Sequence, residues 1–300
     1  MRLNLLFSVG APSVGARSEW RMAWRRLCRN RAAIVGGAIL LLLVLMAVLA
    51  DVLAMQGPQA MPDFQYRWVP PGEAGFLLGT DDIGRDVLSR VIHGARLSLR
   101  VGLVSVLIGA TGGTILGLSA GYFGSWVDMV ISRLVEVLLA FPGLLLAIVI
   151  VASLGPGLTN AMLALGVAGI PSYARVVRGT TLAAKELGYV RAARAVGMSD
   201  ARIIVRHILP NVVSPILIMA TLGMGTSIIS AAGLSFLGLG ASPPVPEWGL
   251  ELSMSRGFLE QAPWVSISNG IALSITVLAI NMFGDGLREA LDPQASDWTR

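Results

Sequence analysis

The sequence predicts an all-α membrane protein with six transmembrane helices. Of its 300 residues, 54% are hydrophobic and only 14% are charged, whereas soluble domains carry about 25% charged residues. The mean hydropathy is +0.71, and the apolar residues gather in long runs without a charge. So few charges cannot cover a water-facing surface, which argues against a soluble enzyme. The high hydrophobicity also excludes a disordered chain.

Five uncharged runs locate the expected helices, because one bilayer crossing takes about 20 apolar residues. The run Val137–Ala174 is too long for one crossing. It is interrupted by Gly155-Pro156-Gly157, a turn signal, so it predicts two helices. The run Ile208–Pro246 predicts one helix followed by a Gly- and Pro-rich segment. The six expected spans cover residues 32–54, 101–121, 137–154, 158–174, 211–231 and 264–284, approximately.

The basic residues set the expected orientation, because loops rich in Lys and Arg remain in the cytoplasm. The N-terminal tail 1–31 has seven arginines and one acidic residue, and the loop 175–210 has seven basic residues and two acidic ones. Both are therefore expected on the cytoplasmic side of the membrane. The C-terminal tail 285–300 joins them, and segments 55–100 and 232–263 lie opposite. This topology explains the net charge of +5, so no nucleic-acid partner is expected.

The first residues, Met1–Gly10, have an arginine followed by an apolar stretch, as a secretory signal peptide does. The stretch is short, and a basic tail and a complete span follow it. We therefore expect an uncleaved cytoplasmic tail rather than a signal peptide.

The sequence lacks the residues for several kinds of site. The only lysine, Lys185, follows an alanine, so the Gly-Lys-Ser/Thr of a phosphate-binding loop is missing and any ATP must be hydrolysed by another polypeptide. The single Cys28 excludes an internal disulfide and a CxxC site. Asp81, Asp82 and His93 are conceivable metal ligands, but we expect no metal site in a chain with two histidines.

One expected span contains a stripe of glycines. Gly109, Gly113, Gly117 and Gly121 recur every fourth residue and so share one helix face, where another helix can approach closely. The stripe predicts a packed interface, either with a partner subunit or within the same chain.

Residues 80–100 predict an amphipathic helix outside the membrane that anchors the second span. Its apolar face holds Leu88, Val91, Ile92, Ala95 and Leu99. Its polar face holds Asp86, Arg90, His93, Arg96 and Arg100. Asp86 and Arg90 are four residues apart and are expected to pair.

The loop Tyr189–Pro210 has the pattern helix, glycine, helix. A short helix of small residues ends at Gly197, which suits a helix C-terminus. Ser199 or Asp200 can cap a second helix, whose apolar stripe consists of Ile203, Ile204 and Ile208. This pattern predicts a cytoplasmic docking element with exposed small residues; an ordinary basic loop is the alternative.

At these residues the chain resembles the inner-membrane permease subunits of bacterial ABC importers. Their shared motif is Glu-Ala-Ala, three residues, Gly, nine residues and Ile-x-Leu-Pro. The residues that match at this spacing are Ala192, Ala193, Gly197, Leu209 and Pro210. The sequence departs from the motif at two positions, with Arg191 in place of the glutamate and His207 in place of the isoleucine.

Other stretches resemble one branch of that family, the second permease subunit of dipeptide, oligopeptide and nickel importers. They include residues 78–99, 234–249 and 284–293 and the Trp24-Arg-Arg sequence, so the resemblance covers nearly the whole chain. The residues that carry it on the periplasmic side are Gly79, Thr80, Asp81, Gly84, Arg85, Asp86, Pro243, Pro244, Glu247 and Trp248.

The resemblance implies a type I ABC importer permease fold and a non-catalytic subunit. A sister permease would complete the translocation path, two ATPase subunits would hold ATP and Mg²⁺, and a periplasmic or lipid-anchored binding protein would deliver the substrate. The loop around 189–210 would be the coupling helix seated in an ATPase subunit. The loop Gly233–Trp264 would face the binding protein, with Trp248 as an amphipathic anchor, or would simply cap the helix ends.

The resemblance implies di- and oligopeptides as substrates and leaves glutathione and nickel chelates as alternatives. A protein of a different class, a stand-alone secondary carrier or channel, would need ionisable groups inside its spans. The expected spans contain almost none, which favours an importer subunit.

Overall fold

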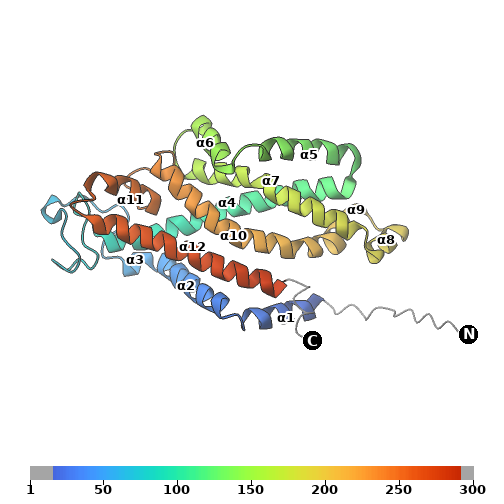
Figure 1. The fold of residues 1–300 in the computed structure, drawn as a ribbon, viewed down its shortest axis with the longest axis horizontal. Coiled ribbons are helices and arrows are strands. Elements are labelled where there is room, and N and C mark those ends of the chain that lie inside the picture. The colour runs from blue at the N-terminus through green and yellow to red at the C-terminus, as the bar shows by residue number, and fades with distance from the viewer. Residues whose placement is uncertain (1–15, 292–300) are drawn as a thin grey trace, which may run out of the picture.

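The structure, a computed structural model, describes residues 16–291, with side chains from residue 21, and this part of the chain consists of helices joined by loops (Figure 1). Met1–Gly10 and the family residues Asp292 and Pro293 lie outside it. The α-helices are α1 (Ala16–Leu27), α2 (Arg31–Val48), α3 (Ala50–Leu53), α4 (Val87–Phe123), α5 (Ser125–Leu139), α6 (Gly143–Leu154), α7 (Leu158–Lys185), α8 (Gly188–Ala195), α9 (Asp200–Ile203), α10 (Leu209–Phe236), α11 (Trp248–Ser255) and α12 (Pro263–Leu291).

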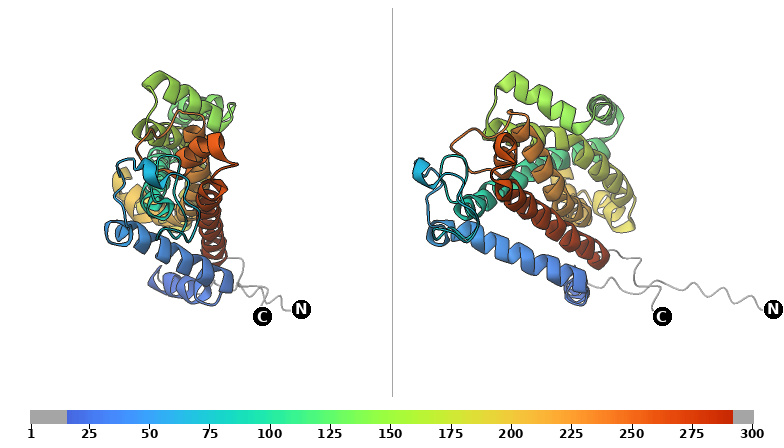
Figure 2. Two further views of the ribbon diagram at one scale, coloured as in Figure 1. Left: turned by 90° about the vertical axis from the view of Figure 1, so that its left-hand side faces the viewer. Right: turned by 60° about the vertical axis from the view of Figure 1, so that its left-hand side comes forward.

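The long helices α2, α4, α7, α10 and α12 run between two ends of the molecule (Figure 1). Residues 55–86 and α11 lie at one end, which we call the cap end. The short helices α8 and α9 lie at the other end, toward which α1 also lies, and we call it the motif end. The right view of Figure 2 shows the same separation, and the left view looks at the molecule from the cap end.

Within the described residues, four helical segments are long and apolar enough to cross a membrane, namely α2, α4, α12 and the continuous segment from α9 through α10. The bent pair α5 and α6 makes a fifth if it is a single span. The expected span 158–174 is the first half of α7, whose second half carries Arg175, Arg178 and Lys185. These basic residues explain why α7 as a whole is less apolar than the other long helices.

The single helix expected over about 137–154 is interrupted in the structure. Residues 137–139 end α5, α6 begins at Gly143, and the two axes meet at 92°. Pro142 explains the break, because it has no N–H to donate within a helix and disfavours a helical conformation at Phe141 before it. The apolar run was correctly identified, but α6 has only 12 residues.

The amphipathic helix and the second span are one continuous helix, α4, of 37 residues. It begins at Val87, so the expected helical start near Thr80 is wrong. Residues 80–86 instead form a turn in which Thr80 and Asp86 make an isolated antiparallel bridge. The side chain of Asp86 accepts a hydrogen bond from the N–H of Ser89 and caps the new helix.

The glycine stripe of α4 lies against α7 of the same chain. A Cβ atom on Gly117 would lie 2.7 Å from Cβ of Val177, and one on Gly121 would lie 2.7 Å from Cβ of Thr181. Distances this short leave no room for a side chain, so glycine is required for α4 and α7 to approach each other. The described chain therefore fills this face itself, without a partner subunit.

At one edge of the molecule, α1 and α2 pack on α12 (Figures 1 and 2). Asn30 caps α2 by accepting a hydrogen bond from the N–H of Ala33 at 3.0 Å. Ala23 and Leu27 of α1 belong to a cluster with Ala290 of α12. The N-terminal basic region is thereby fixed to the last helix.

Candidate coupling site

The motif element, residues 186–210, is a short helix, a sharp turn and a second helix at the motif end. Gly197 ends α8 with φ +79°, a conformation that favours glycine. Its N–H donates to the carbonyl of Arg194, and the N–H of Met198 donates to the carbonyl of Ala193. This pair of bonds is a Schellman motif, so the glycine fixes the angle at which the chain leaves α8.

A turn of π-helix over Ile204–Ile208 joins α9 to α10. The proline at position 210 explains it, because a proline ring inside an α-helix clashes with the carbonyl four residues earlier, here that of Arg206. Widening the helix by one residue relieves this clash. His207, the substituted motif position, lies within this turn, and its ring centroid is 5.9 Å from that of Tyr189.

The motif element has one buried and one exposed face. Ala193 and Val190 are buried together with Ile203 and Ile208, whereas the expected docking residue Ala192 is exposed. Val196 at the end of α8 is 80% exposed, an unusual position for a large apolar side chain. The exposed basic residues are Arg191, Arg194, Arg202 and Arg206. The exposed surface is thus mainly basic, since these four arginines outnumber the exposed Glu186 and Asp200, and it includes the apolar side chain of Val196.

Arg191, which replaces the motif glutamate, forms an exposed ion pair with Glu186 at 2.7 Å. Such pairs are worth below about 1 kcal/mol. An acidic side chain therefore lies beside the start of the motif, but it comes from a residue five positions earlier in the chain.

Neither of the expected capping residues caps α9 through its side chain. The Asp200 carboxylate instead accepts a hydrogen bond from the hydroxyl of Tyr122 in α4, at 2.5 Å. Sequence reasoning missed Tyr122, because nothing in the pattern of α4 distinguishes this tyrosine from an apolar core residue.

At the cap end, the family residues of 79–86 build a closed turn. The Asp81 carboxylate accepts hydrogen bonds from the backbone N–H of Arg85 at 2.8 Å and from its guanidinium at 2.6 Å. Gly84 has φ +82°, which a side chain would strain. The Thr80 hydroxyl donates to the carbonyl of Tyr66 and accepts from the N–H of Val69. These residues form the turn that leads into α4.

The expected exposed polar face of 86–100 is wrong for its first half, because Asp86, Arg90 and His93 are buried. Arg90 does not pair with Asp86. Its guanidinium instead binds Glu251 of α11, with Nε donating to the carboxylate at 2.8 Å. Asp86 is occupied as the cap of α4. The covering helix α11 supplies a partner 161 residues away, which the local pattern could not reveal.

Trp248 does not extend from the loop as an anchor, because its side chain is buried completely. Its indole N–H donates to the carbonyl of Val91 at 3.1 Å, and its ring fills the space beside Gly94. Glu247 caps α11 by accepting hydrogen bonds from the N–H groups of Gly249 and Leu250. Pro243 and Pro244 precede this cap through a cis peptide bond. The loop therefore covers the helix ends, as the alternative interpretation held.

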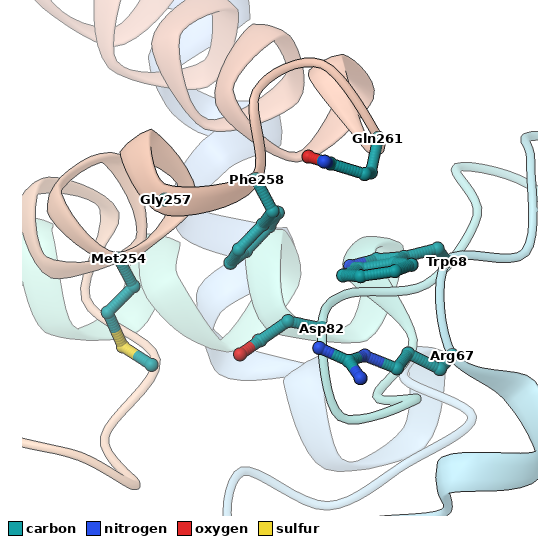
Figure 3. Close-up of a pocket in the computed structure, with 7 residues that line it drawn as sticks. All are labelled: Arg67, Trp68, Asp82, Met254, Gly257, Phe258 and Gln261. Carbon is teal, nitrogen blue, oxygen red and sulfur yellow. The ribbon is translucent and has the colours of Figure 1, made fainter.

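A pocket of about 450 Å³ opens at the cap end between the segment 55–86 and the connection from α11 to α12 (Figure 3). The guanidinium of Arg67 lies 3.9 Å from the centre of the Trp68 ring. Burial, and then the charge of Asp81, raises the pKa of Asp82 above its ordinary value. The pocket is lined by Arg67, Trp68, Asp82, Met254, Gly257, Phe258 and Gln261.

The residues considered as possible metal ligands make other contacts in the structure. Asp81 is bound by Arg85, and His93 lies 3.2 Å from the carbonyl of Gln56 through its Nε2 atom. Among residues 16–291, no three His, Cys, Asp or Glu side chains are grouped so that they could hold a metal ion.

The chain matches two family descriptions. Residues 113–297 match "Binding-protein-dependent transport system inner membrane component", and residues 18–71 match "N-terminal TM domain of oligopeptide transport permease C". The first match includes the end of α4, the motif element and α5 to α12, and the second includes most of α1 together with α2 and α3.

Similar proteins have transport names. The chain is 47% identical over 93% of its length to the dipeptide transport system permease protein DppC of Alkalihalophilus pseudofirmus, of which it covers 91%. It is 46% identical over 93% of its length to the glutathione transport system permease protein GsiD of Pectobacterium atrosepticum, of which it covers 92%. It is 43% identical over 94% of its length to the di/tripeptide transport system permease protein DppC of Pseudomonas aeruginosa, of which it covers 95%.

Solved structures share the fold. An inward-facing MetNI methionine ABC transporter chain aligns with 68% of this chain and 97% of its own length, with a TM-score of 0.54 and 22% identity. A chain of an amino acid ABC transporter aligns with 68% of this chain and 94% of its own length, with a TM-score of 0.52 and 20% identity. The fold is therefore that of type I ABC importer permeases. With the family match over more than half of its residues, the chain belongs to the inner-membrane permeases of binding-protein-dependent transport systems.

Proposed function

We propose that this chain is the second permease subunit of an ATP-driven importer for short peptides and forms half of its translocation path. The observation that supports this most is the motif element, a rigid helix–glycine–helix with a basic, partly apolar exposed face at one end of the helical bundle. Such an element suits docking into another protein and transmission of its movement as a rigid body.

In this proposal the chain crosses the membrane six times and the motif end is cytoplasmic. α2, α4, α10 and α12 each cross once, and α5 with α6 crosses as a bent pair. α7 supplies the sixth crossing, because it leads from the connection after α6 to α8 at the motif end (Figure 1). Both termini would then lie in the cytoplasm, beside the basic residues that favour that side.

Two ATPase subunits would bind the cytoplasmic side and hold ATP and Mg²⁺. The exposed arginines of the motif element predict an acidic groove on the ATPase subunit, and Val196 predicts an apolar floor. This chain's only lysine donates to the carbonyl of Tyr122 at 2.8 Å, so it is engaged inside the fold. Replacement of the motif glutamate by Arg191 implies that the groove accepts a guanidinium there.

A substrate-binding protein would deliver the substrate to the cap end. The buried contacts of Arg90, Glu251 and Trp248 hold the cap rigidly on α4, which suits a docking platform. A sister permease would complete the path alongside the apolar helices.

Short peptides are the first proposed substrate class, because the relatives from Alkalihalophilus and Pseudomonas are named for di- or tripeptide transport. Glutathione, itself a tripeptide, is the second candidate, because GsiD is almost equally similar at 46% identity. Binding of dipeptides, tripeptides and glutathione to the cognate binding protein, measured by calorimetry, distinguishes the two.

The test of the proposal is reconstitution of the chain in liposomes with its sister permease, ATPase subunits and binding protein. We expect uptake of labelled peptide against its gradient that requires ATP and every partner. Uphill uptake by this chain alone, driven by an ion gradient, would contradict the proposal and identify a secondary carrier.

A further inference from the structure

Tyr122 lies where the long helix α4 meets the motif element. It is the next-to-last residue of α4, and only 4% of it is exposed. Its ring belongs to a core cluster with Val177 of α7, Val190 of α8 and Ile203 of α9. One residue of α4 is thus surrounded by three elements that follow it in the sequence by more than 50 positions.

Polar groups from three successive elements converge on Tyr122. Its hydroxyl donates to the Asp200 carboxylate of α9 at 2.5 Å. Its carbonyl, in the last turn of α4, accepts from the Lys185 ammonium of α7 at 2.8 Å. The guanidinium of Arg194 in α8 lies 5.4 Å from the centre of its ring. Groups from α7, α8 and α9 therefore all contact this one residue, and Asp200 binds its hydroxyl.

These contacts differ in kind from the apolar packing around them. Apolar contact is not directional, so a packed element can still slide or rotate slightly. A hydrogen bond to a charged group constrains both distance and angle, and is among the stronger ones in proteins. The bond from Tyr122 to Asp200 therefore fixes the position of the motif element relative to the end of α4.

From this geometry we infer that Tyr122 is a positioning residue for coupling, which ties the docking element to α4 so that the two move together. The inference rests on the proposed function of the motif element. Without the hydroxyl, the ring still fills its place in the core, but a displaced motif element no longer carries α4 with it. ATP hydrolysis then continues while transport falls.

The experiment compares Tyr122→Phe with wild type in the reconstituted importer, by measuring peptide imported per ATP hydrolysed. We expect normal assembly, retained ATPase activity and a ratio about tenfold lower, the factor that corresponds to one hydrogen bond to a charged group. Asp200→Ala, at an exposed carboxylate, should give the same loss. Asp200→Asn retains an oxygen that accepts the hydroxyl and should restore most of the ratio. The double variant Tyr122→Phe/Asp200→Ala should be no worse than either single variant.

Tyr173→Phe is the matched control. Tyr173 is also a buried tyrosine, but its hydroxyl donates to the carbonyl of Met219 inside the bundle, at 3.2 Å. It should keep the wild-type ratio. A wild-type ratio for both Tyr122→Phe and Asp200→Ala, or additive losses in the double variant, would overturn the inference. Failure of the proposed function is a different result, because wild-type protein would then show no ATP-dependent uptake at all.

Discussion

Arg90 of α4 and Glu251 of α11 form an ion pair from which water is almost entirely excluded, since their side chains are 5% and 3% exposed. The carbonyl of Pro244 accepts two further hydrogen bonds from the same guanidinium. The Arg90 side chain therefore connects the start of α4 with the Pro243–Pro244 segment and with α11, and it holds α11 against α4.

Replacing Glu251 with alanine should destabilise the protein by about 3 kcal/mol or more, because it leaves a buried guanidinium without its charge partner. The measurement is thermal unfolding of the purified complex. Glu136→Ala is the control, because its pair with Arg133 is exposed and should contribute below about 1 kcal/mol. Equal melting temperatures for the two variants would refute the structural role of the buried pair.

Gly94→Ala should lower stability by about 1–3 kcal/mol through overpacking, because the added Cβ would lie 2.5 Å from the Trp248 indole. Gly179→Ala is the matched control in α7, where a Cβ meets nothing within 4 Å. Alanine there should leave stability unchanged or raise it by up to about 1 kcal/mol, because it favours helix. The melting temperature of Gly94→Ala should therefore fall clearly below that of Gly179→Ala. Similar decreases in melting temperature for the two variants would argue against the contact between residue 94 and the Trp248 indole.

Gly197→Val should separate ATP hydrolysis from uptake, because the left-handed conformation that ends α8 costs a branched residue at least about 1–2 kcal/mol. The direction of the second helix would then change. ATPase activity and peptide uptake, measured on the same vesicles, check this. Gly188→Ala at the start of α8, without a positive φ and with open space around it, should keep both activities. Wild-type uptake by Gly197→Val would exclude the role of this turn in transmission.

Asp82 should make stability depend on pH. Burial raises the pKa of its carboxyl in the folded protein above the reference value of 3.8. In the interval between the two pKa values the folded state holds more protons than the unfolded state, so stability falls as pH rises. The melting temperature of Asp82→Asn minus that of wild type should therefore increase as pH rises from about 4 upward.

Asp51→Asn is the control for this pH dependence, because the pKa of Asp51 is shifted in the opposite direction. The hydrogen bond from Arg96 lowers the pKa of Asp51, so its contribution is complete above pH 3.8 and is lost at lower pH. The melting temperature of Asp51→Asn minus that of wild type should stay constant over the pH range in which the corresponding difference for Asp82→Asn increases. A constant difference for both variants would remove Asp82 as the cause.

The sequence predicts the positions of the membrane-spanning helices best where a long run contains no charged residue. The uncharged runs correctly located α2, α10 and α12, because a bilayer crossing excludes charges over a known length. The same rule predicted two helices, 80–100 and 101–121, in place of the single helix α4, because a charged residue such as Arg100 is normally taken as the end of a span. In the structure Arg96 donates to the carbonyl of Ala47 and pairs with Asp51, so the helix continues through these arginines.

Contacts over long sequence distances could not be predicted. Glu251 and Trp248 each meet α4 from more than 150 residues away, and no spacing rule connects them. Tyr122 and Asp200 are 78 residues apart, which is also beyond the reach of a local pattern. By contrast, the turn at Gly197 depends on neighbouring residues alone, which is why the motif indicated it.

The uninterrupted length of α4 has a mechanical consequence. At about 1.5 Å per residue, its 37 residues extend over about 55 Å. Arg90 with its ion pair lies near the start of this helix, and Tyr122 lies near its end. The described part of this helix contains no proline or break, and the glycine stripe fixes α7 along its side. In the proposed importer, a substrate-binding protein at the cap end and ATPase subunits at the motif end would act on opposite ends of this one helix, so that movement at either end would reach the other without a hinge between them.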